Sequence, residues 1–170
     1  MLKRPEKEEY APYYETYISK VPDGDYESFL QSQLEEITAL YSKFDDKKGL
    51  HRYAPGKWSL KEVLGHITDT ERVMSYRMLR IARGDTTKLP GFDQDVFIAN
   101  TSFDEVSIED LLHDFQAVRQ STFTLLKTIA DSAWSRAGNA STYDITARAL
   151  AYVIAGHAQH HISVVQERYV

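Results

Sequence analysis

The residues of this chain best placed to do chemistry are two histidines one helical turn apart. His157 and His161 lie in a largely apolar segment near the C-terminal end of the sequence. In an α-helix, residues i and i+4 lie about 40° apart around the axis and about 6 Å apart along it. Both imidazoles then point to the same side of the helix, a spacing that one divalent transition metal can bridge.

The apolar stripe of the same helix predicts that both rings point into the protein. It passes between His157 and His161, whereas His160 falls at its edge. A polar group buried without a partner costs on the order of 1–3 kcal/mol. Each ring could therefore be a core histidine hydrogen-bonded to a carbonyl or a carboxylate, or the pair could bind a metal with a third ligand from another helix. The stripe consists of Leu150, Val153, Ile154, Val164 and Val165.

The composition limits the classes of protein that need to be considered. The chain has 170 residues, of which 42% are hydrophobic and 26% charged, as expected for one globular domain over residues 1–170. It has no cysteine, which excludes disulfides, thiolate metal ligands and a cysteine nucleophile. The net charge is −5 and no basic stripe is present, so we expect no nucleic-acid partner.

The N-terminal segment does not resemble a signal peptide. Residues 1–14 are charged and rich in tyrosine, and they lack an apolar core. No apolar run in the chain approaches the roughly 20 residues that a membrane span needs. We therefore expect a cytoplasmic protein that does not enter a membrane, and a homodimer remains possible.

Apolar residues at helical spacing predict four long helices. Asp25 and Ser107 are candidate N-caps, Ser59 and Glu62 form a capping-box pattern, and Gly84 is a candidate C-cap. No stretch shows the alternation of a half-buried strand. The pattern predicts an all-α fold, a four-helix bundle. The predicted helices cover about residues 26–44, 60–83, 108–129 and 145–168.

The segment between the second and third predicted helices is unusually long. It covers about residues 85–106, more than a turn between neighbouring antiparallel helices needs. We therefore expect a long crossover connection that lets these two helices run parallel. Residues 96–98 are apolar enough for a short helix within it. Whether the connection only covers the bundle or also contributes to a site stays open.

Three further histidines could supply the third metal ligand. His51 lies in a polar stretch and His113 stands next to Asp114, which suggests an outer face. His66 lies in the middle of the second predicted helix, on the shoulder of the apolar stripe. The spacing alone therefore gives His66 only modest support.

Two segments together resemble the DinB/YfiT-like metalloprotein superfamily. They are Trp58–Glu71, which reads WSLKEVLGHITDTE, and far downstream Gly156–His161, which reads GHAQHH. The resemblance covers about residues 26–169. It implies a four-helix bundle of unusual topology in which one histidine of the second helix and a His-x-x-x-His pair of the last helix bind a divalent metal, usually nickel or zinc. This motif maps onto His66, His157 and His161.

Three histidine ligands leave positions on a metal open, as in catalytic and not in closed structural sites. The resemblance also implies relatives that transfer low-molecular-weight bacterial thiols and a thiol-dependent isomerase. We expect a metal-dependent enzyme acting on a small molecule, a thiol S-transferase or a hydrolase. The alternatives are a non-catalytic metal- or ligand-binding bundle, and a structural bundle with hydrogen-bonded, empty histidines.

Three other polar residues are candidates for the site. Asp69, three residues after His66, could orient a ligand histidine from the second shell or be a solvated surface acid. Glu71 falls near the centre of an apolar stripe, which favours a structural ion pair with an inward arginine over a role in the site. Arg119 lies beside the stripe of the third helix, where it could bind an anionic group of the substrate or extend from the bundle edge.

Overall fold

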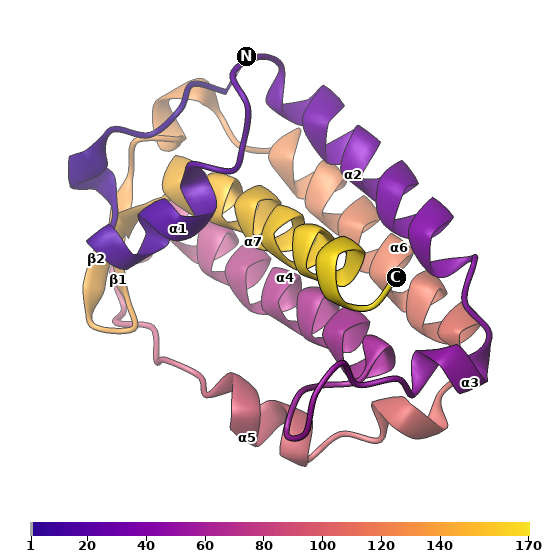
Figure 1. Ribbon diagram of the computed structural model, residues 1–170. Coiled ribbons are helices and arrows are strands. Elements are labelled where there is room, and N and C mark those ends of the chain that lie inside the picture. The colour runs from indigo at the N-terminus through magenta and orange to yellow at the C-terminus, as the bar shows by residue number, and fades with distance from the viewer. Residues whose placement is uncertain (1) are drawn as a thin grey trace.

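Four long helices form a bundle in the computed structural model, which describes residues 2–170 (Figure 1). The prediction of a four-helix bundle is confirmed. None of the described helices is long and apolar enough to span a membrane. The long helices are α2 (Tyr26–Tyr41), α4 (Leu60–Ala82), α6 (Ile108–Leu126) and α7 (Ala147–Arg168). Shorter elements are η1 (Lys7–Glu9), η2 (Pro12–Tyr14), α1 (Glu15–Ile18), α3 (Asp46–Gly49), α5 (Gln94–Ala99), η3 (Phe103–Glu105), η4 (Asp131–Ala133), β1 (Ala137–Ala140) and β2 (Tyr143–Thr146).

Side-chain caps fix where these helices begin. The Asp25 side chain accepts a hydrogen bond from the Ser28 amide at the start of α2. Ser59 and Glu62 form a reciprocal capping box at the start of α4, as predicted. At the other end of α4, Gly84 has a φ of +83°, the left-handed conformation that glycine adopts without strain.

Contacts between the long helices establish an uncommon order of directions. α4 and α6 run parallel, because Glu71 pairs with Arg119 and, further along both helices, Arg83 donates to the Thr128 carbonyl just beyond α6. α4 and α7 run antiparallel, since the Tyr169 hydroxyl at the end of α7 donates to the carbonyl of residue 58 just before α4.

A crossover connection makes the parallel pair possible. Residues 84–107 leave the end of α4, pass along the outside of the bundle through α5 and return to the start of α6 (Figure 1). Phe103 of this segment packs on the backbone of α4 at Gly65, where an added Cβ would come within 2.4 Å of the ring. The predicted crossover is confirmed, as is a short helix around residues 96–98.

A short β-hairpin precedes α7, and here the sequence analysis is wrong, since it expected no strand. β1 and β2 pair antiparallel over four residues each. Ser141 and Thr142 join them with φ values of 54° and 75°. Hairpins of this kind usually carry Asn-Gly or Asp-Gly at these positions. The strand Ala137–Ala140 has no polar–apolar alternation either, so neither local signal was present.

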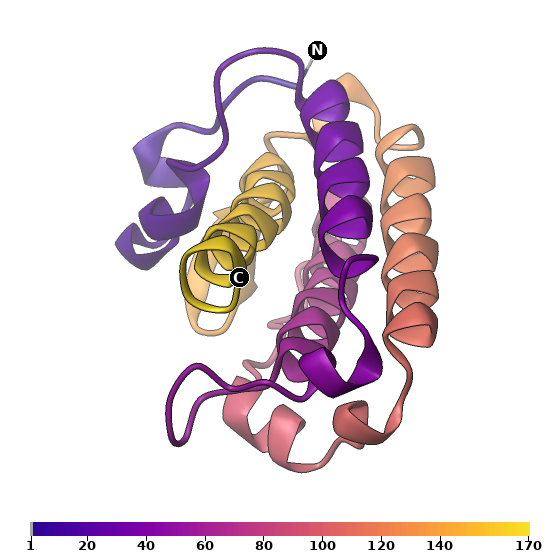
Figure 2. The ribbon, with the colours of Figure 1, turned by 45° about the vertical axis from the view of Figure 1, so that its right-hand side comes forward.

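The short helices of residues 2–21, the N-terminal arm, lie along α7 on the side away from α2 (Figure 2). Gly156 permits the contact, because a Cβ there would come within 2.0 Å of the Tyr17 carbonyl oxygen. Glu9 of the arm pairs with Arg148 and accepts a hydrogen bond from Thr146 at the start of α7. The arm therefore belongs to the folded unit, although the predicted bundle began only at residue 26.

A layer of buried polar side chains divides the apolar core into two clusters. On α2, Leu30 belongs to one cluster and Ile37 to the other, with buried Gln33 between them. On α7, Ala155 and Ala158 are divided in the same way by His157. The layer also includes buried residues of α4 and α6: His66, Thr70, Glu71 and Arg119. Any chemistry inside the bundle has to draw on this layer.

Candidate metal site

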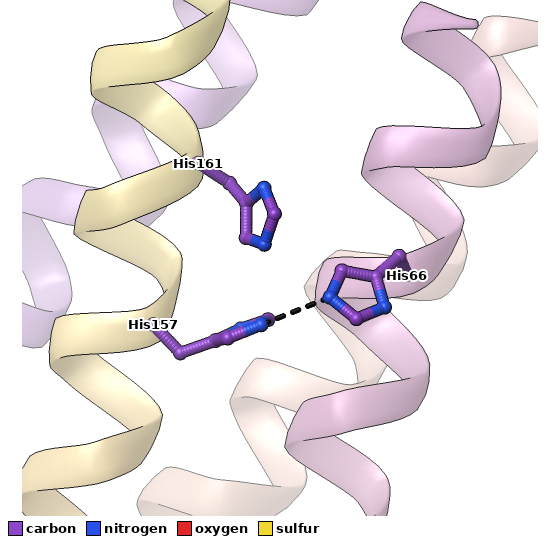
Figure 3. A group of neighbouring side chains, drawn as sticks. All are labelled: His66, His157 and His161. Carbon is purple, nitrogen blue, oxygen red and sulfur yellow. Dashed lines mark hydrogen bonds between the residues drawn. The ribbon is translucent and has the colours of Figure 1, made fainter. Parts of the chain in front are cut away.

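Three histidines from two helices converge within the polar layer. His66 projects from α4 toward His157 and His161 of α7, which lie one turn apart (Figure 3). One nitrogen of each ring lies within 4.8 Å of the others, and the Nε2 atoms of His66 and His157 are 3.0 Å apart. The three residues singled out from the sequence are therefore neighbours in space.

The rings have no strong partner in the protein other than one another. Among residues 2–170, no carboxylate or backbone carbonyl accepts a hydrogen bond from any of the three, and the contact between His66 and His157 is the one recorded. Their other neighbours are aromatic. The Trp58 ring centre lies 4.7 Å from that of His66, and the Tyr17 ring centre lies 5.3 Å from that of His157. The alternative of core histidines satisfied by carbonyls or carboxylates is not what the structure contains.

Burial keeps these imidazoles neutral. It lowers the pKa of His66 from 6.5 to about 4. It lowers the pKa of His157 and His161 well below 6.5, and repulsion from the neighbouring histidines lowers both further. A neutral imidazole has a free lone pair, which is the form that binds a metal ion. The cluster is therefore in its ligating state at neutral pH.

The donor set and spacing fit a divalent transition metal. Two nitrogens that each lie about 2.05 Å from one tetrahedral ion are roughly 3.3 Å apart, close to the observed 3.0 Å between His66 and His157. Imidazole ligands suit zinc, nickel, copper and iron. No other histidine, aspartate or glutamate among residues 2–170 joins the cluster. Three protein ligands would leave at least one position open.

A pocket of about 680 Å³ opens on His66 and His157. Its wall includes Thr70, whose Oγ1 is the one buried side-chain polar atom without a hydrogen-bond partner among residues 2–170. Such an atom costs free energy unless a water or a ligand completes it. The rest of the wall comes from the N-terminal arm, α4, the crossover connection, the hairpin and α7, and it includes Tyr13, Tyr14, Tyr17, Met74, Arg77, Phe92, Asp93, Tyr143 and Val153.

A second pocket of about 420 Å³ lies on the other side of the cluster, beside His160 and His161. Gln94 and Asp95, in the first turn of α5, line both pockets. The crossover connection therefore does more than lengthen the chain, because its helix forms part of the wall on either side of the three histidines.

Comparison with known proteins places the chain in a family. The sequence of residues 30–165 matches the family model of the DinB superfamily. The chain belongs to the DinB superfamily. A search of curated proteins finds no significant match.

Two solved structures share the DinB-superfamily fold of this chain. YfiT from Bacillus subtilis, described as a probable metal-dependent hydrolase with an unusual four-helix bundle topology, matches with a TM-score of 0.71 and 19% identity, covering 86% of this chain and 87% of YfiT. A mycothiol-dependent maleylpyruvate isomerase matches with a TM-score of 0.67 and 12% identity over 89% of this chain. The match spans 62% of the isomerase. At these identities, the likeness concerns the fold.

The remaining histidines of this DinB-superfamily chain lie outside the cluster. His160 is half-buried, and its ring centre is 5.0 Å from that of His161, but it does not join the three. His51 and His113 are exposed, as their sequence neighbours suggested. Asp69 is half-buried and lies 3.3 Å from Arg72, with no hydrogen bond to a histidine. Its position is that of a helix-surface ion pair.

Glu71 and Arg119 pair with each other inside the bundle. The carboxylate of Glu71 lies 2.8 Å from Arg119 Nη2, and Arg119 also donates to the Leu30 carbonyl. The expected ion pair between Glu71 and an inward arginine is confirmed. The Arg119 side chain is fully buried and lies outside the walls of both pockets.

The sequence analysis did not identify Thr70, Arg77 and Tyr17 as site residues. Thr70 lies one helical turn after His66, so the i+4 rule applied to that histidine would have found it. Arg77 lies a further two turns along the same face of α4. Tyr17 carried no such signal, because the arm is short and irregular and its position depends on the close contact at Gly156.

Proposed function

We propose that this protein is a metal-dependent enzyme acting on a small molecule, and that His66, His157 and His161 hold one divalent ion, nickel or zinc. The observation that carries the proposal is the convergence of three neutral imidazoles without other strong partners, two of which, His66 and His157, line a pocket. A ligand-sized pocket with a few polar groups and strongly shifted pKa values is the usual form of an active site.

The metal supplies the chemistry that the side chains lack. A divalent ion held by the three histidines would favour the deprotonated form of a water or a thiol at its open position. The chain has no cysteine, so a thiol would have to arrive as a co-substrate. Two reaction classes follow, hydrolysis with water and S-transfer with a low-molecular-weight thiol. The descriptions of YfiT as a probable hydrolase and of the isomerase as mycothiol-dependent support these two classes.

The protein's own residues would position the reactants. Thr70 lines the pocket beside His66, and a rotation of its side chain would let its buried, unpartnered hydroxyl hydrogen-bond a polar group of a molecule there. The Trp58 and Tyr17 rings pack against His66 and His157 and restrict their rotation. α5 limits the access of water from the side of the crossover connection. Ligands fixed in this way require little reorganisation when the reaction begins.

Activity and metal content, measured on the same samples, test the proposal. The protein is purified without a histidine tag and assayed for metal, for turnover of a chloro-dinitroarene with an added low-molecular-weight thiol, and for ester hydrolysis. We expect the rate and the metal occupancy to fall together in His66→Ala, His157→Ala and His161→Ala. His51→Ala and His113→Ala, which change exposed histidines, serve as matched controls and should stay close to wild type.

The possible outcomes either overturn the proposal or assign the reaction class. Full activity in metal-free protein would overturn the metal mechanism. Activity with water and not with thiols would assign hydrolysis, and the reverse would assign S-transfer. A metal-loaded protein without either activity would support the alternative of a non-catalytic metal- or ligand-binding bundle.

Thermal unfolding gives a separate test of the metal site. An ion that binds only the folded state at a free concentration 100 times its Kd stabilises that state by about 2.7 kcal/mol. We therefore expect added nickel or zinc to raise the Tm above its value in chelator, and His157→Ala to remove that increase. Equal Tm values with chelator and with metal would show that no ion is coupled to the fold.

A further inference from the structure

Arg77 is a buried arginine in the wall of the larger pocket that has no carboxylate partner. It is 2% exposed, and no aspartate or glutamate among residues 2–170 lies within salt-bridge distance of it. Its Nη2 atom donates to the Pro90 carbonyl at 2.6 Å and to the Ser141 hydroxyl at 2.9 Å, and its Nη1 atom lies 3.6 Å from the Met74 sulfur. The guanidinium carbon also lies 5.6 Å from the centre of the Phe92 ring. All of these partners are neutral, so none of them brings a full negative charge to the guanidinium.

The contrast with Arg119 shows how unusual this is within the molecule. Arg119 is equally buried, and three of its hydrogen bonds go to the Glu71 carboxylate. Guanidinium groups stay protonated in proteins, so Arg77 cannot avoid the cost of burial by losing its proton. Burial also lowers the pKa of Arg77, which reflects the same unfavourable environment. An anion in the pocket would supply the missing charge.

The position of Arg77 defines where that anion would lie. His66, Thr70, Met74 and Arg77 all line the same pocket from one face of α4. Eleven residues of helix separate the Cα atoms of His66 and Arg77 by about 16 Å. Both side chains lean toward the N-terminus of the helix, as the contact of Arg77 with Met74 shows, and the longer arginine reaches further, so the guanidinium lies about 10–15 Å from the imidazole of His66.

The other pocket residues favour a singly charged group. Asp93 and Asp95 of the crossover connection also line the pocket, and both are exposed. Their charges would repel a dianion more strongly than a monoanion. The planar fork of a guanidinium matches a carboxylate in two parallel hydrogen bonds. Between the histidines and Arg77 the wall is largely apolar, with Met74 and Val153 among its residues.

We propose that Arg77 binds a carboxylate of the substrate, and that the substrate carries this carboxylate about 10–15 Å from its reacting group, across a mainly apolar body. The distance rests on the proposed function, because it assumes that the reacting group lies at the three histidines. The carboxylate subsite itself does not need a metal.

A series of ω-mercaptoalkanoic acids of increasing chain length tests the proposal, with ω-mercaptoalkanols of equal length as neutral controls. Binding to the metal-loaded protein is measured by calorimetry. We expect the acid to bind about 10- to 100-fold more tightly than the alcohol once the chain is long enough to reach Arg77. Arg77→Met should abolish this preference. Arg80→Met is the matched control, because Arg80 lies on the same helix but pairs with Asp85 outside the pocket.

A second measurement separates this proposal from the metal site. Binding of 4-phenylbutanoate and of 4-phenylbutanol is compared in wild type and in metal-free His157→Ala protein. A preference for the carboxylate in both proteins supports the subsite whatever the fate of the metal. A wild-type protein that binds no nickel or zinc but keeps this preference would overturn the proposed function alone.

Other outcomes overturn the subsite. Equal binding of acid and alcohol, or no binding of the acid, would show that Arg77 is structural. Tighter binding of 4-phenylbutylphosphonate than of the carboxylate would overturn the carboxylate assignment. Circular dichroism checks that Arg77→Met is folded. Arg77→Lys, which keeps the charge but loses the planar fork, should retain an intermediate preference and provides the test if the methionine variant does not fold.

Discussion

Two buried polar centres lie in the same layer of the bundle, and both involve α4. They differ in whether other residues of the chain supply their hydrogen-bond and charge partners. The pair of Glu71 and Arg119 joins opposite charges at 2.8 Å, and the Leu30 carbonyl takes a further arginine hydrogen bond. The cluster of His66, His157 and His161 has one hydrogen bond, between two of its own members. The first centre needs nothing from outside the chain, and the second lacks a partner.

In this protein, burial therefore does not distinguish a structural polar group from a functional one. What distinguishes them is whether the chain itself supplies all the hydrogen-bond and charge partners of the group. In folded proteins nearly all buried polar groups have hydrogen-bond partners, since each missing partner lowers the stability of the folded state. Several buried groups that lack a full set of partners line the same pocket. His66 and Thr70 line it, and Arg77 lines it a further two turns along α4. The complete pair of Glu71 and Arg119 lies outside it.

Removing one member of the pair of Glu71 and Arg119 should have the largest effect on the free energy of unfolding. Glu71→Ala leaves the Arg119 charge buried and unpaired, and we expect a loss of about 3–5 kcal/mol in the free energy of unfolding. Replacing both residues by methionine removes the charge problem and should restore most of that loss. Urea unfolding in the presence of chelator measures both variants. A double variant as unstable as Glu71→Ala would show that the pair is not the source of the effect.

Acidification should act on the cluster of His66, His157 and His161, with a smaller effect for each histidine. The folded-state pKa of His66 is about 4, against 6.5 for an ordinary histidine, and those of His157 and His161 are also lowered. Between these values the unfolded chain binds protons that the folded protein does not, so stability is present above pH 6.5 and is lost as the pH falls toward 4. One such histidine contributes up to about 1.4 kcal/mol per pH unit in this window.

Unfolding of the metal-free protein at several values between pH 7 and pH 5 tests this dependence. The slope should be smaller in His66→Gln, which removes one of the three groups, and unchanged in His113→Gln, which alters an exposed histidine. An equal slope in wild type and in His66→Gln would show that acid destabilisation arises elsewhere in the molecule.

Sequence periodicity was sufficient for the bundle because its signals are local. Capping residues and apolar stripes placed the four long helices. The largest errors are at the ends of α2, which stops at Tyr41 and not near residue 44, and of α6, which stops at Leu126 and not near residue 129. The length of the connection between α4 and α6 predicted the crossover, since a parallel pair needs a long return. The pairing of Glu71 with an inward arginine followed from a charge in an apolar stripe.

The site was predictable only in part, because its residues come from segments far apart in the sequence. Spacing on one helix indicated His157 and His161, but His66 lay on the shoulder of its stripe and was selected by family resemblance. The walls of the pocket depend on contacts that no local pattern records. Tyr17 reaches His157 because Gly156 admits the backbone of the N-terminal arm. Arg77 becomes notable only when the structure shows that no carboxylate meets it.

Asp69 provides the smallest and most discriminating comparison, because it lies between His66 and Glu71 in the sequence. If it oriented a ligand histidine, its loss would weaken metal binding by about 10- to 100-fold. Its observed partner is Arg72, itself exposed and shared with Asp114, and such surface pairs contribute little to stability. We expect Asp69→Asn to change metal affinity by less than about twofold and unfolding free energy by less than about 0.5 kcal/mol. Competition with a chelator and urea unfolding measure the two quantities, with Asp114→Asn as the control that perturbs the same arginine. A tenfold loss of metal affinity in Asp69→Asn alone would mean that the histidine cluster does draw on a carboxylate of the chain, and the contrast between a complete and an incomplete centre would then be one of degree.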